Sequence, residues 1–275
     1  MTWFEELLMA FDYGFMWRAL FVGIAVAISG AFIGPFLVLK RFSMIGHGLA
    51  HVAFAAVAIG LVTNQEPFIV TLILVVAASI FILKLNRSPR LQGDAAIALT
   101  AAVAMALGTV IASTAGGFNV DLFSYLFGSI LTIQRIDVYL SITFAATIVV
   151  IVLLFYHDLF SLTYDEDFAR ISGVRARRLN TLLAVLIGVT IAVGIRAVGT
   201  LLISSLIIFP TIIALQFSRG FKMTILLAVL ISTVNVLFGL VSSFLLDWPS
   251  GSTIVLLNGV VFMAIYGIRL LKPQN

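Results

Sequence analysis

The chain has 275 residues, 62% of them hydrophobic and only 10% charged, and its mean hydropathy is +1.19. A soluble domain of this length could not carry so apolar a composition, so we expect a protein that crosses a membrane many times. The chain has no cysteine, which excludes disulfides, thiolate metal ligands and cysteine nucleophiles. The net charge of +4 resides mostly in loop lysines and arginines, and therefore indicates topology rather than affinity for nucleic acid.

The apolar segments are about 20 residues long, which is the length of a helix that crosses hydrocarbon. They lack the ten-residue alternation of an outer-membrane barrel. We therefore predict an all-α, polytopic membrane bundle that forms a single domain over residues 1–275, with roughly eight to nine transmembrane helices. In chain order the predicted spans are Phe15–Leu39, Ser43–Gly60, Phe68–Leu83, Ala95–Ser113, Val138–Tyr156, Leu179–Ile195, Val198–Phe217, Thr224–Leu246 and Thr253–Leu270.

One apolar stretch, Leu122–Leu131, is too short to cross hydrocarbon by itself. We interpret it as a re-entrant half-helix, because irregular backbone at membrane depth is tolerated only where it is buried in protein or lines a cavity.

The longest polar segment, residues 157–178, has the charge order of a short surface helix. Acidic residues come first, an arginine follows, and a glycine stands where such a helix ends. The residues concerned are Asp165, Glu166, Asp167, Phe168, Ala169, Arg170 and Gly173. From these residues alone, a solvated loop between two spans explains the segment as well.

Lysine and arginine are distributed unevenly between the predicted loops. If the regions of Lys40, Lys84, Arg175, Arg219 and Lys272 share one side of the membrane, all but three of the 16 basic residues lie there. The positive-inside bias makes that side cytoplasmic. We therefore expect a multi-pass membrane protein with a cytoplasmic C-terminus.

A polar interruption in the second span is the strongest candidate for a working site. His47 and His51 are four residues apart, so on an α-helix they share one face and can reach a common ligand. Imidazole inside a membrane span is costly unless it meets a partner, a cavity or a permeating ion. A cation held there needs neutral imidazoles, so acid near the unperturbed histidine pKa of about 6.5 should weaken its binding. Interior histidines bonded to neighbouring helices explain the spacing equally well.

Other classes of membrane protein fit the residues less well. A zincin-type protease requires His-Glu-x-x-His, whereas Gly48 follows His47 here, and no glycine-flanked motif surrounds Ser29 or Ser43. The chain also lacks a phosphate-binding loop of the Gly-x-x-x-x-Gly-Lys type, so it does not hydrolyse ATP by that route. A passive metal channel is not excluded by composition.

Seven sequence blocks resemble the membrane permease subunits of bacterial ABC importers for zinc, manganese or iron. They are Phe15–Leu20, Gly34–Gly46, Ala50–Ala53, Leu126–Leu131, Ala169–Val174, Arg196–Leu202 and Asp247–Gly251. The resemblance covers nearly the whole chain. It implies a homodimeric permease, two cytoplasmic ATPase subunits and an extracytoplasmic receptor that delivers the metal, which is imported by alternating access. It also implies no permanently bound cofactor, no nucleic-acid partner and no enzymatic activity in this subunit.

The same resemblance assigns roles to residues. It implies metal ligation by His47 and His51, and it makes Asp165–Gly173 the coupling helix that sits in a groove of the ATPase. The family helix usually carries an aspartate four residues before the histidine, and here His47 stands at that position. Loss of a carboxylate disfavours manganese and suits zinc, and two copies could surround one ion with four imidazoles. Manganese or iron remains the alternative cargo.

Two aspartates are expected near the outer mouth, where acidic groups would attract cations. These are Asp121 and Asp247. A turn aspartate that is simply solvated is the other explanation for each of them.

Overall fold

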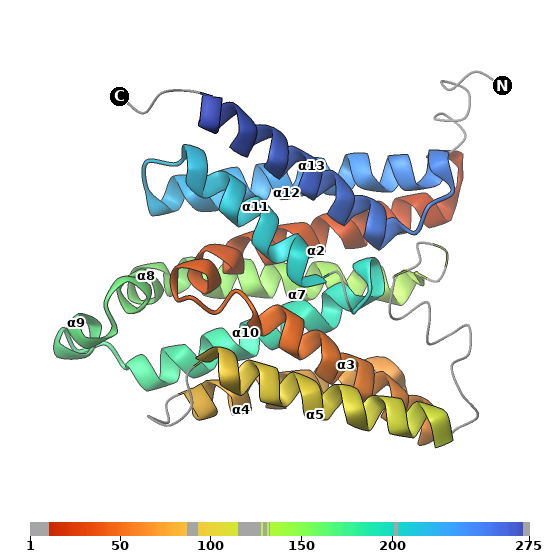
Figure 1. Cartoon of the computed structure of the whole chain (residues 1–275), viewed down its shortest axis with the longest axis horizontal. Coiled ribbons are helices and arrows are strands. Elements are labelled where there is room, and N and C mark those ends of the chain that lie inside the picture. Colours follow the sequence, from red (N-terminus) through yellow and green to blue (C-terminus); the bar gives the residue numbers. More distant parts are fainter. Residues whose placement is uncertain are drawn as a thin grey trace.

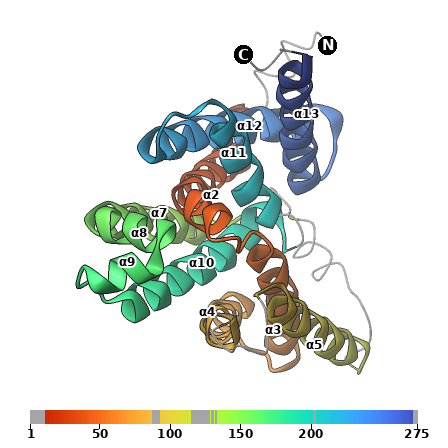
Figure 2. The same ribbon diagram turned by 60° about the vertical axis from the view of Figure 1, so that its left-hand side comes forward.

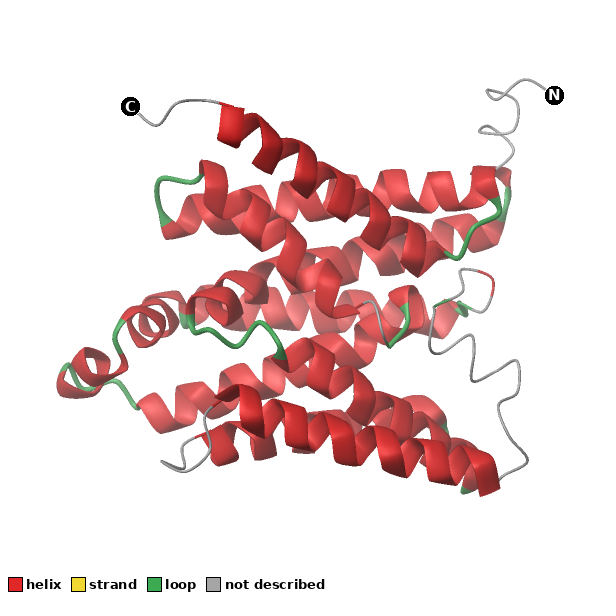
Figure 3. Cartoon of the chain, viewed as in Figure 1, coloured by secondary structure: helices red, strands yellow, loops and turns green. Residues whose placement is uncertain are grey.

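The computed structural model describes residues 11–86, 93–114, 128, 131, 133–200 and 203–271. Every regular element within these ranges is helical, as predicted (Figure 1, Figure 3). The helices are α2 (Gly14–Leu39), α3 (Ile45–Val62), α4 (Pro67–Asn86), α5 (Gly93–Thr114), α7 (Arg135–Leu154), α8 (Tyr156–Tyr164), α9 (Glu166–Ile171), α10 (Ala176–Val198), α11 (Ile203–Phe217), α12 (Phe221–Leu246) and α13 (Ser250–Leu271).

Eight of the described helices are long and apolar enough to cross a membrane, namely α2, α3, α4, α5, α7, α10, α12 and α13. The ninth apolar helix, α11, has 15 residues. That is about 22 Å of helix, against about 30 Å of hydrocarbon. The prediction of eight to nine membrane helices is therefore confirmed.

The predicted boundary between the seventh span and the one before it is wrong by a few residues. α10 continues to Val198, and Gly199 then turns the chain with a φ of 87°. Such a left-handed conformation favours glycine because glycine has no Cβ. The span predicted to begin at Val198 therefore begins at Ile203.

α2 forms the centre of the bundle, where it packs against α7, α10, α11 and α12. Figure 2 shows these four helices around it. Glycine permits the close approach: a Cβ added at Gly34 would lie 2.1 Å from Thr211 Oγ1 of α11, and one at Gly23 would lie 2.8 Å from Val236 Cγ1 of α12. Small residues hold membrane helices together because they let backbones come close.

A second group, formed by α3, α4 and α5, lies beside α10 (Figure 2). α3 contacts both other helices of the group, and it also contacts α10 and α11. α5 crosses α3 at Gly108, where an added Cβ would lie 2.7 Å from the ring of the buried Phe54. α3 is thus held between the central helices on one side and α5 on the other.

The two ends of the bundle differ in charge. α8 and α9 lie at one end, together with the C-terminal ends of α2 and α4 and the start of α10 (Figure 1, Figure 3). Lys40, Lys84 and Arg175 therefore share this end, as the loop asymmetry predicted. The turns between α3 and α4 and between α12 and α13 lie at the opposite end (Figure 1).

Two further details differ from the prediction. α7 begins at Arg135 rather than Val138, because Gln134 and Asp137 form a reciprocal capping box that fixes an earlier start. The polar segment contains two helices, α8 and α9, rather than one. The expected re-entrant segment, Leu122–Leu131, lies outside the described residues except for its single positions 128 and 131.

The α3–α5 contact is tested by Gly108→Ala. We expect a lower thermal midpoint in detergent, because the added methyl group overpacks the contact with Phe54 at a cost of about 1–3 kcal/mol. Gly259→Ala in α13 is the matched control, since its Cβ meets no atom within 4 Å and the exchange favours the helix. Equal midpoints for the two variants would contradict the close approach.

Candidate metal site and polar network

His47 and His51 lie side by side on the first turns of α3, as their spacing predicted. Their Nε2 atoms are 3.2 Å apart, and the rings meet edge to face with centroids 4.7 Å apart. At this separation one Nε2–H donates to the other ring when no cation is present. The two Nε2 atoms therefore face each other beside the helix.

The glycines on either side of His47 determine where the pair faces. An added Cβ at Gly46 would lie 2.8 Å from Ser204 of α11, and one at Gly48 would lie 2.6 Å from Ile97 of α5. Because successive helical residues are about 100° apart, His47 points outward between the directions of α11 and α5. In agreement, the His47 side chain is exposed in the single chain and His51 is half-buried.

The pair is chemically incomplete within one chain. Among the described residues, no group of three or more His, Cys, Asp or Glu side chains could hold a metal ion. The Nδ1 atom of His51 is buried and has no hydrogen-bond partner in the described part of the molecule. Among the described contacts, the hydrogen bond of His47 and His51 joins the two rings to each other. The described residues therefore show no bond from this pair to a neighbouring helix.

The pair lies at depth in the bundle rather than at its end. The loop after Leu39 runs along the molecule away from α9, so α3 starts well inside the bundle (Figure 1, Figure 3). His47 comes two residues after that start. The pair therefore lies part-way along the bundle, away from the end that bears α9.

The predicted surface helix is α9, and it begins and ends as its residues indicated. Asp165 is the N-cap, and its Oδ1 accepts hydrogen bonds from the N–H groups of Asp167 and Phe168 at 3.0 and 2.9 Å. Ser172 closes the helix, and Gly173 follows with a φ of 87°. The Phe168 side chain is 62% exposed, while Ala169 is buried against the protein. α9 therefore presents an aromatic side chain to the outside of the end on which it lies.

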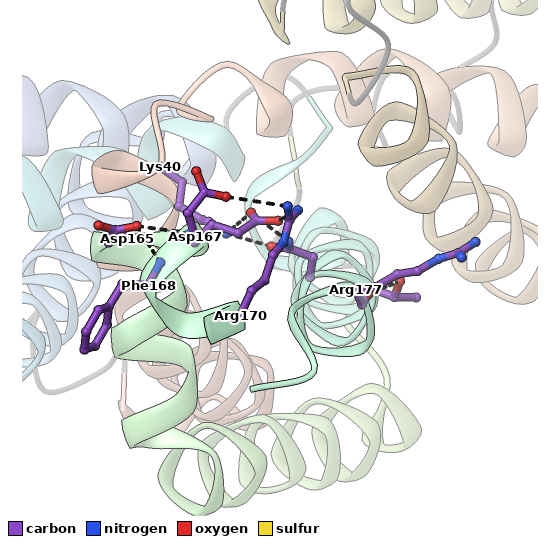
Figure 4. A network of polar contacts seen from close by, with 9 residues as sticks. Lys40, Asp165, Asp167, Phe168, Arg170 and Arg177 are labelled. Atoms are coloured by element: carbon purple, nitrogen blue, oxygen red, sulfur yellow. Dashed lines mark hydrogen bonds and ion pairs between the residues drawn. The ribbon is translucent and has the colours of Figure 1, made fainter. Parts of the chain in front are cut away.

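A polar network, drawn in Figure 4, anchors α9 to two membrane helices. Asn180 of α10 accepts a hydrogen bond from Lys40 Nζ at 2.6 Å and donates one to Glu166 Oε2 at 3.0 Å. Arg170 bonds the other carboxylate oxygen of Glu166. Lys40 Nζ itself lies 3.8 Å from Glu166 Oε2. The network thus joins the end of α2, the start of α10 and the first residue of α9.

These contacts lower the pKa of Glu166. Partial burial works to raise it, but the hydrogen bond from Asn180 and the charges of Lys40 and Arg170 together outweigh burial. The carboxylate's contribution to stability is therefore present above the ordinary glutamate pKa of about 4.3, and it is lost as pH falls through the lower folded value. Glu166 therefore stays ionised throughout the neutral range.

The two aspartates expected at the outer mouth differ in what can be described. Asp247 is exposed in the turn between α12 and α13, at the end opposite α9, and it adopts a left-handed conformation with a φ of 53° (Figure 1). Asp121 lies outside the described residues.

Comparison with known families places the chain. A model of the ABC 3 transport family matches residues 12–268. The chain belongs to this family. The resemblance to metal ABC permeases that the seven sequence blocks indicated is thereby confirmed.

Individual relatives of the permease share nearly its full length. It is 31% identical to a "Probable metal transport system membrane protein" of Treponema pallidum, over 94% of this chain and 96% of that one. It is 28% identical to the "High-affinity zinc uptake system membrane protein ZnuB" of Haemophilus influenzae, over 90% and 95%. The solved structure of "PsaBC from Streptococcus pneumoniae in complex with Fab" matches with a TM-score of 0.85 and 26% identity, over 96% of this permease and 95% of that chain.

Sequence reasoning missed Lys40 and Asn180. Lys40 looked like a residue that ends a span, and Asn180 looked like the start of the next one. A buried asparagine at the start of an apolar helix is a weak signal by itself. Its partners lie 140 and 14 residues away, which no local pattern reveals.

The Asp165 cap is tested by comparing Asp165→Ala with Asp165→Asn. Alanine removes the acceptor for the first amides of α9 and costs about 1 kcal/mol, whereas asparagine is an equally good N-cap. We expect amide hydrogen exchange at Asp167 and Phe168 to accelerate about fivefold in the alanine variant, as that free energy implies, and to stay near wild type in the asparagine variant. Equal exchange in both variants would contradict capping by Asp165.

Proposed function

We propose that the chain is the permease subunit of an ATP-driven zinc importer, in which His47 and His51 of two copies hold the ion during its passage. The observation that carries this proposal is the convergence of the two Nε2 atoms at 3.2 Å. Zinc–nitrogen distances of about 2.0–2.1 Å place two ligands of a tetrahedral site about 3.3–3.4 Å apart. The pair therefore already has nearly the separation that one zinc ion requires.

The donor set supports zinc over manganese. Imidazole nitrogen suits zinc, whereas manganese favours carboxylate, carbonyl and water oxygen. Among the described residues, no carboxylate forms a metal-holding group with the histidines. Relatives named for manganese exist, including the "Manganese transport system membrane protein MntC" of Listeria innocua at 27% identity, and they make manganese the second candidate cargo.

A second copy of the chain would complete the site. One chain offers two nitrogens, and its His47 faces outward beside α5 and α11, whose outer surfaces carry exposed apolar side chains such as Leu99 and Phe217. Two copies related by a two-fold axis through this face bring four imidazoles around one ion, which is the coordination number of zinc.

The remaining parts of the importer follow from the ends of the molecule. The end that bears α9 is the more basic one, so the positive-inside bias makes it cytoplasmic and places the C-terminus inside. The ATPase then docks on α9, with Phe168 as the exposed contact. The opposite end, with Asp247, faces the extracytoplasmic receptor. ATP binding and receptor docking together alternate which end of the histidine site is open.

The role of the histidines is tested by His51→Ala in vesicles that contain the permease, its ATPase and zinc-loaded receptor. We expect zinc uptake to fall about 100-fold, because losing a ligand costs at least as much as losing a residue that orients one. His157→Ala is the matched control, since this third histidine lies in α8 outside the membrane spans. Unchanged uptake in the His51 variant would remove the pair from the mechanism.

Stoichiometry and selectivity provide a second test, independent of the ATPase. The purified wild-type permease is expected to bind one zinc ion per two copies in equilibrium dialysis. His47→Asp restores a carboxylate and should shift the preference from zinc toward manganese by about tenfold, because it replaces a nitrogen ligand with a harder oxygen. One zinc per single copy, or an unaltered preference in the variant, would contradict a shared imidazole site.

A further inference from the structure

We infer that Lys40, Asn180 and Glu166 form a mechanical relay that couples movement of α9 to the start of α3, where the histidines lie. The inference rests on the proposed function, because it names residues that transmit ATPase movement to the metal site. All three are positioning residues and touch neither the metal nor the nucleotide.

The orientation of Lys40 is the first observation. A lysine at the end of a membrane helix ordinarily extends its ammonium group into water. The Lys40 side chain instead turns inward and is only 11% exposed, with its Nζ bonded to Asn180 and close to Glu166. The adjacent Arg41 is exposed, as a helix-terminal cation normally is. Solvation of a helix end therefore explains the exposed side chain of Arg41, but it does not explain why the Lys40 side chain turns inward.

Asn180 makes the connection specific. Its side chain is buried, with 5% exposure for the residue, and it uses both ends of its amide: the oxygen accepts from Lys40 and the nitrogen donates to Glu166. The nearly buried ammonium group of Lys40 is costly to separate from Asn180 and Glu166, because it would then lie poorly solvated, whereas Glu166 is held to α9 by Arg170 as well. A displacement of α9 is therefore carried to Lys40 rather than absorbed by loss of the contacts.

Lys40 leads directly to the metal helix. It is the C-cap of α2, and the turn that follows is closed by hydrogen bonds from Phe42 N–H to Leu37 O at 2.9 Å and from Ile45 N–H to Phe42 O at 3.0 Å. Ile45 is the first residue of α3, two residues before His47. The chain from the relay to the first imidazole is thus seven residues long and internally bonded.

A small pocket also lies beside the turn. A cavity of about 20 Å³ lies beneath it, lined by Lys40, Phe42, Ile45 and Asn180 among others. This volume is enough for about one water molecule. Figure 4 shows the polar contacts on the other side of Lys40, toward α9. The turn is accordingly tied to α9 through Lys40 and packed on the core through Ile45, so a shift of α9 reaches α3 through bonded and packed residues.

The experiment measures zinc transported per ATP hydrolysed, with permease, ATPase and zinc-loaded receptor reconstituted together. We expect Lys40→Gln to lower this ratio about fivefold or more while the ATPase still co-purifies with the permease. Lys40→Arg should restore most of the ratio, because the cation returns. Arg41→Gln is the matched control: it removes the neighbouring, exposed cation and should leave the ratio unchanged.

Non-additivity is the second readout. If the three residues act as one unit, the double variant Lys40→Gln/Glu166→Gln should transport as much zinc per ATP as the single variant with the larger loss. An unchanged ratio in Lys40→Gln, an equal loss in Arg41→Gln, strictly additive losses, or failure of the ATPase to co-purify would each overturn the relay. Absence of ATP-dependent zinc uptake by the wild-type permease would instead overturn the proposed function, so the two failures are distinguishable.

Discussion

The cost of polar groups in hydrocarbon is the constraint on which the rest of this molecule depends. In lipid, each polar side chain must find a partner, line a path for ions or water, or lie at an end of the bundle. Many polar side chains here have a partner within the protein. Asn235 of α12, for example, is buried and donates a hydrogen bond to Asn258 of α13 at 2.8 Å. The two histidines of α3 differ: they bond only to each other among the described contacts, and one of them is exposed on the single chain. The proposed metal site gives this pair the partner that the described part of a single chain does not supply.

The same constraint explains how much could be predicted from the sequence. Hydropathy located the membrane helices because each span must satisfy its backbone internally over a nearly fixed length. Local chemistry located α9, since Asp165 and Gly173 act on their immediate neighbours. The facing of His47 and His51 followed from a four-residue spacing. Errors arose at helix ends: α7 starts early because of a side-chain cap, and Gly199 delays the start of α11.

The network around Asn180 lay beyond prediction for a physical reason. Its residues come from helices that are distant in sequence, and they meet only because α2 and α10 pack together and α9 folds back over them. No periodicity encodes such a meeting. A lysine after an apolar run reads equally as a solvated stop signal or as an inward anchor, and only tertiary contacts separate the two. This is also why Lys40 and Arg41, adjacent and alike in charge, have different surroundings.

Metal preference in such a scaffold depends on very few atoms. The fold is shared at a TM-score of 0.85 with the solved PsaBC structure, and relatives that match over about 90% or more of both chains carry names for both manganese and zinc. What differs can be as small as the side chain at position 47, because a helical turn fixes the geometry and the side chain supplies only the donor atom. Alternating access needs the same helix movements for either metal, whereas tight binding needs a matching donor. Under the proposed function, selectivity is set on α3, and energy is transmitted through its junction with α2 and α9. The two are adjacent in the structure, because the short turn after Lys40 and the packing of α3 on α10 both join them.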